Sequence, residues 1–245
     1  MAQPIDLPNH VSRLTQTESF TFSCHQGVKC FTECCRMLEL ALTPYDVLRL
    51  RKATGLTSRQ LLDDYIIVEQ DPGEPFPRFY LTMVDDGRAS CVFVAEGGCT
   101  VYEHRPAACR AYPLGRAAIR CEDGRIEEHF VLIQENHCLG FKEPVPQNAI
   151  EYSVEQELLT YNSFNDAVAT VLQHNAIQKG FIPSATQIEF FILTLYNIDT
   201  FREMVQNDKI ESITLTPPEK NALQNDEKLL LFGIDWLRKH LFSPF

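Results

Sequence analysis

The pattern of hydrophobic and polar positions changes along the chain. Residues 1–20 are polar and show no clear period, so we expect an extended or loose arm. Across 42–55, Thr43 suits a helix N-cap, Pro44 the first helical position and Gly55 a left-handed end. Thr57 and Gln60 then form a capping-box pattern, which predicts a second helix and a helical hairpin. The hydrophobic face of that second helix is predicted to contain Leu61, Leu62, Tyr65, Ile66 and Val68.

The pattern beyond residue 77 is typical of strands and later of helices. Residues 78–84 and 91–95 are predicted as short strands. Residues 117–133 predict a hairpin, because Asp123-Gly124 is a favoured two-residue turn. The hydrophobic period becomes helical from about residue 149, and capping patterns begin at Ser184 and Thr216. The three helical segments that we expect are 153–179, 184–206 and 217–241.

Together these elements predict an α+β fold with three regions. Residues 1–21 are the N-terminal arm, and residues 22–148 are a cysteine-rich metal-binding region with short helices and a β-hairpin. Residues 149–245 are an α-helical region that we expect to pack on it. The cysteines end before this last region, which supports the boundary at 148.

Composition and charge narrow the class of protein. The chain has 245 residues, 44% of them hydrophobic and 22% charged, so it can bury a substantial core. The formal net charge of -11 disfavours a nucleic-acid partner, whose phosphates would be repelled. The N-terminus lacks the pattern of a secretory leader, and no segment reaches the roughly 20 apolar residues of a membrane span. We therefore expect a cytoplasmic protein without a membrane partner.

Nine cysteines are the strongest chemical signal in the sequence. A reducing cytosol keeps thiols unpaired, so their density favours a thiophilic metal ion or an iron-sulfur cluster. Two alternatives remain open: reduced structural cysteines without metal, and a disulfide framework. Cys121, on the first arm of the predicted hairpin, is expected to be a buried strand residue outside the site. The predicted metal ligands are Cys24, Cys30, Cys34, Cys35, Cys91, Cys99, Cys109 and Cys138.

The spacing of these cysteines bears on how many centres they form. Cys24, Cys30 and Cys34 lie close enough in sequence to converge on one ion. Adjacent side chains diverge, so Cys34 and Cys35 do not easily share one ion, and one of them is expected to serve another centre or to bridge. Eight sulfurs suit two four-ligand centres, or one cluster with spare ligands.

Charged neighbours of these cysteines are candidates for a supporting role. Arg105 and Arg110 flank Cys109, and their cations would lower the cost of burying a negatively charged centre. The alternative for both arginines is an ordinary ion pair. The histidines at 25, 104 and 137 are expected beside the metal ligands or at the surface, with the alternative that one of them replaces a sulfur ligand.

The order of motifs between residues 22 and 141 resembles the YkgJ-like cysteine-cluster (CxxCxxCC) family of zinc- or iron-chelating proteins. That family usually begins with Cys-x2-Cys-x2-Cys-Cys, whereas the spacings here are five and three. The stretch 161–166 is also similar to bacterial members. The motifs that carry the resemblance are Phe22-x-Cys24, Cys34-Cys35-Arg36, Leu42-Thr43-Pro44-x-Asp46, Cys91, Gly98-Cys99-Thr100-Val101-Tyr102, Arg105-Pro106-x-x-Cys109-Arg110-x-Tyr112-Pro113 and Cys138-x-Gly140.

The resemblance implies metal binding, with a structural or redox role as the leading hypothesis. Iron-sulfur (4Fe-4S) is preferred to zinc, because eight sulfurs exceed the needs of one zinc ion and because the family includes flagellin lysine N-methylases linked with such a cluster. Another hypothesis is metal storage or delivery, which would need labile and exposed ligands.

Those relatives also imply an alternative function, an S-adenosylmethionine-dependent protein lysine N-methyltransferase. Its basic protein substrate would be attracted by the acidic surface. Asp46, Tyr102 and Tyr112 could line the pocket of such an enzyme. The alternative is that Asp46 caps a helix and the two tyrosines are half-buried packing residues. The chain has no G-x-G-x-x-G motif, so a Rossmann-type site for the methyl donor is not indicated. It also lacks the Cys-x3-Cys-x2-Cys motif of radical enzymes, because Met37 stands where the third cysteine would be.

Overall fold

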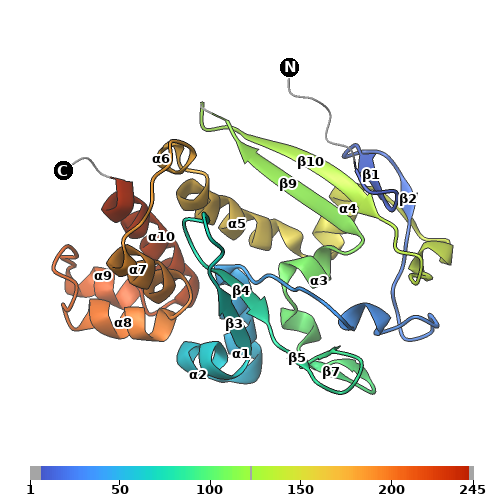
Figure 1. Cartoon of the computed structure of the whole chain (residues 1–245), viewed down its shortest axis with the longest axis horizontal. Coiled ribbons are helices and arrows are strands. Elements are labelled where there is room, and N and C mark those ends of the chain that lie inside the picture. The colour runs from blue at the N-terminus through green and yellow to red at the C-terminus, as the bar shows by residue number, and fades with distance from the viewer. Residues whose placement is uncertain (1–6, 122, 243–245) are drawn as a thin grey trace. The chain divides into compact units, whose positions relative to one another are not determined.

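The computed structural model describes residues 7–121 and 123–242. Main-chain contacts divide the chain into two compact units, coloured by residue number in Figure 1. Helices and small antiparallel strand pairs occur together, which confirms the α+β class. Unit 1 comprises Met1–Leu38, Met83–Tyr102 and Ala107–Thr160, and unit 2 comprises Glu39–Thr82, Glu103–Pro106 and Tyr161–Phe245. The three regions predicted from the sequence, with boundaries after residues 21 and 148, remain a prediction that is separate from this division by contacts.

The main sheet of unit 1 has the strand order β1-β10-β9 and is antiparallel throughout (Figure 1). β9 (Leu114–Arg120) and β10 (Ile126–Ile133) form the predicted hairpin. β9 ends at Arg120, so Cys121 lies just beyond the strand rather than within it, and its N–H donates to the Arg125 carbonyl at 2.8 Å. Residue 122, between the two strands, lies outside the described residues.

Part of the expected N-terminal arm is strand. β1 (Val11–Leu14) pairs with β10, with Leu14 opposite Phe130. β2 (Phe20–Thr21) pairs with β11 (Pro146–Gln147). Only Leu14 of β1 is buried, so the segment has no hydrophobic alternation that would have predicted a strand. Residues 1–6 of the arm lie outside the described residues.

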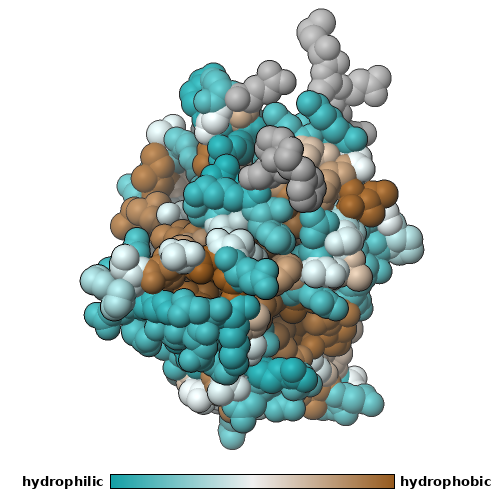
Figure 2. Space-filling model, turned by 90° about the vertical axis from the view of Figure 1, so that its left-hand side faces the viewer, coloured by the Kyte–Doolittle hydropathy of each residue, from teal (hydrophilic) through white to brown (hydrophobic). Residues whose placement is uncertain are grey.

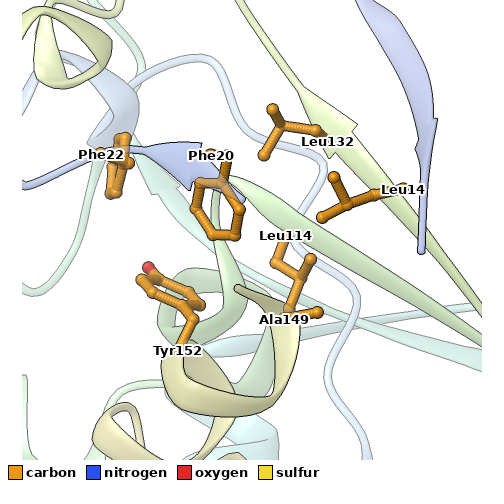
Figure 3. Packing of buried hydrophobic residues seen from close by; sticks show 7 residues of the cluster. All are labelled: Leu14, Phe20, Phe22, Leu114, Leu132, Ala149 and Tyr152. Carbon is orange, nitrogen blue, oxygen red and sulfur yellow. The ribbon is translucent and has the colours of Figure 1, made fainter. Parts of the chain in front are cut away.

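A cluster of seven buried residues in unit 1 joins the main sheet to one helix (Figure 3). Tyr152, on α4 (Ala149–Glu155), contacts Phe20 and Phe22 edge-on, and its hydroxyl donates to the Tyr112 carbonyl. Asn148 caps α4 in a capping box with Glu151. The buried cluster consists of Leu14, Phe20, Phe22, Leu114, Leu132, Ala149 and Tyr152.

The rest of unit 1 consists of very short elements that carry most of the cysteines. Two strand pairs, β5 with β6 and β7 with β8, have two residues in each strand. Pairs this short have little intrinsic stability and depend on their surroundings. Their bounds, with those of the short helices, are η1 Glu33–Cys35, β5 Met83–Val84, β6 Ser90–Cys91, β7 Val94–Ala95, β8 Gly98–Cys99, α3 Ala107–Ala111 and η3 Gly140–Lys142.

Unit 2 begins with the predicted helical hairpin. α1 (Pro44–Thr54) is capped by Thr43 and ends at Gly55, which has φ 70°. α2 (Ser58–Asp64) begins with the capping box of Thr57 and Gln60. Both helix starts were predicted correctly.

The residues after α2 correct one expectation. Ile66 and Val68, predicted on a helix, belong instead to β3 (Ile66–Glu69), which pairs with β4 (Arg78–Leu81). Three consecutive β-branched residues, 66–68, favour a strand, and this preference outweighs the helical spacing of the hydrophobic positions.

Helices fill the C-terminal part of unit 2, in shorter pieces than the three predicted segments. The segment predicted at 153–179 is divided among α4, α5 and α6, with Glu157 at φ 53° between the first two. The capping boxes at Ser184 and Thr216 are present as predicted. α5 and the short helix η2 (Tyr102–His104) include residues of both units. The bounds are α5 Leu158–Leu172, α6 Asn175–Gln178, α7 Ala185–Leu195, α8 Ile198–Gln206, α9 Pro217–Ala222 and α10 Asp226–Phe242.

Unit 2 contains the larger hydrophobic core. Phe79 stacks on Tyr196 with ring centroids 3.5 Å apart, and Phe76 stacks on Phe191 at 4.3 Å. On the face shown in Figure 2, hydrophobic residues lie exposed between hydrophilic ones. The largest fully buried side chains of this unit are Tyr45, Val47, Leu50, Leu61, Phe79, Tyr161, Phe191, Leu195, Phe201, Leu229, Leu230 and Leu237.

Within residues 7–121 and 123–242, no helix has both the length and the apolar character needed to cross a bilayer.

Candidate metal centre

All nine cysteines lie in unit 1, and the structure records them as thiols rather than disulfides. They come from separate elements. Cys24 and Cys30 lie in the loop after β2, whereas Cys34 and Cys35 are in η1. The remaining predicted ligands are Cys91 at the end of β6, Cys99 at the end of β8, Cys109 in α3 and Cys138 in the turn after β10.

Main-chain pairing joins the first cysteine block to the second. Arg36 forms an antiparallel bridge with Ser90, the Arg36 guanidinium donates to the Ser90 hydroxyl, and the Met37 N–H donates to the Ala89 carbonyl at 2.8 Å. In antiparallel pairing, the residue before one partner lies opposite the residue after the other. Cys35 is therefore placed beside Cys91, although 55 residues separate them in sequence.

A second contact holds the loop of the first block against the β7–β8 hairpin. Gly98 has φ 116°, and a Cβ there would lie 3.1 Å from the Phe31 ring, so the glycine allows this approach. The Gln26 side-chain amide donates to the Gly97 carbonyl at 3.0 Å. The hairpin carries Cys99, so the loop that contains Cys30 is held next to it.

A third contact brings the trailing cysteine to the start of the first block. The Ser23 N–H donates to the Gly140 carbonyl at 3.1 Å, and a Cβ at Gly140 would lie 2.8 Å from the Ser23 carbonyl oxygen. The Leu139 N–H donates to the Cys30 sulfur at 3.1 Å. Cys138 is thereby placed with the segment that holds Cys24 and Cys30.

The adjacent thiols of Cys34 and Cys35 behave differently. The Cys35 thiol donates a hydrogen bond to the Cys34 sulfur, which lowers the pKa of Cys34 to about 7. The same hydrogen bond raises the pKa of Cys35, and burial raises it further. The negative charges of Cys34, Cys109 and Cys91 add to that increase in the pKa. Cys34 is therefore the thiol of this pair that ionises first.

Two other thiols are also influenced by neighbouring cysteines. Burial raises the pKa of Cys91, and the charge of Cys99 contributes in the same direction. Burial raises the pKa of Cys138 too, with further increases from the charges of Cys30 and Cys34. These sulfurs are thus close enough for their charges to repel.

The thiols do not yet converge on one point. Among the described residues, no group of three or more His, Cys, Asp or Glu side chains is arranged to hold a metal ion. The donor set nevertheless fits zinc or an iron-sulfur cluster, because thiolate is a preferred ligand of both. Coordination by three or more of these side chains would therefore require them to turn toward a common centre.

The two arginines near Cys109 are both buried. Arg110, which is 3% exposed, donates to the Gln156 carbonyl at 2.9 Å and pairs with Glu157 at 3.1 Å. Arg105 belongs to unit 2, where its carbonyl accepts from the Tyr161 hydroxyl at 3.2 Å. The supporting role predicted for both guanidinium groups stays a prediction.

The histidines near the cysteines contact carboxylates. His25 lies 3.5 Å from Glu143, and His137 lies 3.6 Å from Glu135. Both imidazoles are about half exposed. His104 falls in unit 2.

The residues considered for a methyltransferase pocket have different surroundings. Asp46 is buried and completes the capping box of α1, with its carboxylate 2.8 Å from the Thr43 N–H. Asp46 lies in unit 2, whereas Tyr102 and Tyr112 lie in unit 1.

Tyr112 has a relation to the thiols that sequence reasoning missed. Burial raises the pKa of Tyr112, and the charges of Cys138 and Glu135 raise it further, so its hydroxyl lies near Cys138. The one sequence signal was its position three residues after Cys109.

Thiols of this number, held together by contacts between distant segments, are typical of a metal-binding cysteine-cluster protein. Comparison with known families agrees: residues 23–139 match the CxxCxxCC family model, described as "Putative zinc- or iron-chelating domain". Every predicted ligand lies within the matched range. No curated protein and no solved structure matches the chain. Residues 23–139 are thus supported as a metal-binding domain of the zinc- or iron-chelating type.

Proposed function

We propose that the eight predicted cysteines bind an iron-sulfur cluster or zinc as thiolates, and that the bound metal stabilises unit 1. The observation that carries this proposal is the Arg36–Ser90 pairing, because it joins the Cys34–Cys35 pair to Cys91. Thiols that only filled a core would not need such pairing between distant segments.

The electrostatics of the thiols support a bound cation. Cys35, Cys91 and Cys138 each have a pKa that is raised in part by the negative charge of other cysteines. Without metal, these thiols resist ionisation, since each thiolate repels the next. A bound cation compensates the repulsion and keeps the sulfurs ionised.

The small core of unit 1 supports a structural role. The cluster that packs its main sheet against α4 contains seven buried residues, and six of its described strands have two residues each. Domains with small cores commonly depend on a structural metal or on disulfides. Metal bound by cysteines from several segments would cross-link them and stabilise the unit.

A redox role would depend on a cluster rather than on zinc. Hydrogen bonds to ligand sulfurs tune the potential of iron-sulfur clusters, and the Leu139 N–H already donates to the Cys30 sulfur. Zinc has no redox chemistry and would act as a scaffold. An iron-sulfur cluster bound by these cysteines would allow electron transfer at this site.

Metal analysis of anaerobically purified protein tests the proposal. We expect bound iron with broad visible absorption, or bound zinc without colour, in wild type and in the Cys121→Ser control. Cys91→Ser should hold less metal than both. Wild-type protein without metal, with all nine thiols reacting freely with Ellman's reagent, would overturn the proposal.

A protein lysine N-methyltransferase is the second candidate function. The net charge of -11 favours a basic substrate, as this activity requires. Calorimetric titration of metal-loaded protein with S-adenosylmethionine tests it: saturable heat would support the activity, and no heat would remove it.

A further inference from the structure

We infer that the free edge of β3 is a docking site for an extended, basic segment of a partner protein, which adds to the β3–β4 pair as a third strand. The inference concerns unit 2 alone and does not depend on bound metal. Strand addition of this kind combines main-chain hydrogen bonds, which give affinity, with side-chain contacts, which give specificity.

The main chain of β3 has one side that β4 does not use. In the register of the pair, Ile66 lies opposite Leu81 and Val68 lies opposite Phe79. The Leu81 N–H donates to the Leu40 carbonyl at 3.0 Å, and the Phe79 carbonyl accepts from the same neighbouring segment at 2.7 Å. Both residues of β4 thus direct their main-chain groups away from β3. Since antiparallel pairs alternate between bonded and non-bonded, the main-chain groups of Ile66 and Val68 point away from β4.

That side of β3 has no partner within residues 7–121 and 123–242. β3 and β4 form a two-stranded sheet, and no other strand or isolated bridge pairs with β3. Outside β4, no described residue forms a hydrogen bond with the main chain of Val68. A row of unpaired N–H and carbonyl groups is a template for another strand.

The side chains of β3 suit a strand partner. Ile67 and Val68 point to opposite faces of the strand and are 46% and 45% exposed, whereas Ile66 is buried and anchors the strand in unit 2. Edge strands are commonly protected by lysine, proline or a bulge. β3 has neither residue type, and its register with β4 is continuous from Ile66 to Glu69. Its edge is therefore open to an added strand.

The charge around β3 selects a basic partner. Glu69 lies opposite Arg78 in the register, but the Arg78 guanidinium pairs with Glu74 at 2.9 Å. Among the described residues, Asp64 and Glu69 have no ion pair. The strand and its two flanks carry five carboxylates and two guanidinium groups, which are Asp63, Asp64, Glu69, Asp71, Glu74, Arg59 and Arg78. Lysine or arginine side chains of an added strand would be attracted to this surplus of negative charge.

A second copy of this chain fits the same edge poorly. Parallel pairing of two β3 strands would bring Glu69 of one copy beside Glu69 of the other, and antiparallel pairing would bring the acidic flanks together. Like charges across a strand pair are destabilising. A basic segment of another protein meets no such repulsion.

Binding of a labelled peptide to the full chain tests the site. The probe is a heptapeptide of alternating lysine and valine, followed by fluorescence anisotropy. We expect saturable binding that weakens as salt is raised, and no binding of the matching glutamate–valine peptide.

A pair of substitutions at one position tests the role of the main chain. Val68→Pro removes an N–H that β4 does not use, so the variant should fold but bind the peptide about tenfold more weakly. Val68→Thr is the matched control, because it keeps the N–H and the β-branched shape, and it should bind within about twofold of wild type.

Hydrogen exchange of wild-type protein provides a second test that needs no variant to fold. The lysine–valine peptide should slow amide exchange in β3, at Ile66 and Val68, and leave exchange in β1 of unit 1 unchanged. If circular dichroism shows that Val68→Pro is unfolded, this measurement decides.

Three results would overturn the inference. The first is a lack of binding by the lysine–valine peptide, or equal binding by Val68→Pro and Val68→Thr when both are folded. The second is binding that leaves amide exchange in β3 unchanged, because charge elsewhere would then hold the peptide. The third is self-association of wild type that Val68→Pro abolishes, which would assign the edge to a second copy of this chain.

Discussion

Units 1 and 2 differ in what holds each of them together. The largest fully buried side chains among the described residues all lie in unit 2, where aromatic rings stack. Unit 1 has a cluster of seven buried residues between its main sheet and α4, together with every cysteine of the chain. The comparison indicates that apolar burial stabilises unit 2, whereas for unit 1 we propose that bound metal contributes much of the stability.

Metal removal should have the largest effect, and it should fall on unit 1. A structural zinc site contributes on the order of 10 kcal/mol of apparent binding free energy, which is lost when the metal is chelated. We expect amide protection to fall in β5–β8 and α3, while α7, α8 and α10 keep theirs. Hydrogen exchange followed by mass spectrometry measures both units in one experiment.

Equal loss of protection in both units after chelation would contradict the comparison. Re-addition of metal serves as the control, because it should restore protection in unit 1 only.

A cavity in unit 2 should produce the converse result. Phe201 is fully buried and contacts Phe232 and Trp236, so Phe201→Ala should lower the free energy of unfolding by about 3–5 kcal/mol. Metal content should not change. Urea denaturation measures the loss. Leu231→Ala, at a 45% exposed position, is the control and should cost far less.

Substitution of Gly140 should affect unit 1 more moderately. A Cβ there would lie 2.6 Å from the Phe22 ring, so Gly140→Ala must displace the segment that leads to Cys24. We expect a loss of about 1–3 kcal/mol in stability and weaker metal retention against a chelator. Gly97→Ala is the matched control, because nothing lies within 4 Å of its added Cβ. Equal metal retention in the two variants would show that the close approach of Gly140 to Phe22 and Ser23 is not needed for metal binding.

An ion pair in unit 2 should make a smaller, pH-dependent contribution. Burial alone would raise the pKa of Asp199, but hydrogen bonds from Arg51 and the Ser58 N–H, with the charge of Arg51, lower it. Its carboxylate therefore stabilises the fold fully above the unfolded pKa of about 3.9, and this contribution is lost as pH falls through the lower folded pKa. Asp199→Asn should cost about 1–3 kcal/mol at neutral pH.

Urea denaturation at pH 7 and near pH 3 checks this prediction. The difference between Asp199→Asn and wild type should shrink at the lower pH. Asp63→Asn, which removes an exposed pair with Arg59, should cost only about 0.3–0.5 kcal/mol. A pH-independent difference for Asp199→Asn would show that lost packing, not charge, is responsible.

Local sequence signals predicted much of this fold. The caps at Thr43, Thr57 and Ser184 each act through neighbouring residues, so the sequence alone contains what is needed to find them. β1 was missed because pairing with β10, over a hundred residues away, holds it in place. The strand at 66–68 was misassigned because helical spacing and β-branched residues gave conflicting signals.

The candidate site was predictable in composition but not in arrangement. Cysteine type and spacing identified the residues, and the comparison with known families supports metal binding over residues 23–139. The Arg36–Ser90 bridge and the approach of Ser23 to Gly140 had no sequence pattern, because they depend on the path of the intervening chain. The proximity of Tyr112 to Cys138 has the same origin.

The central claim is that thiolates from distant segments surround an inorganic centre. X-ray absorption at the iron or zinc edge of anaerobically purified protein tests it most directly. The account predicts a nearest shell of sulfur alone, at about 2.3 Å for iron or zinc. A shell of nitrogen and oxygen atoms without sulfur would contradict it.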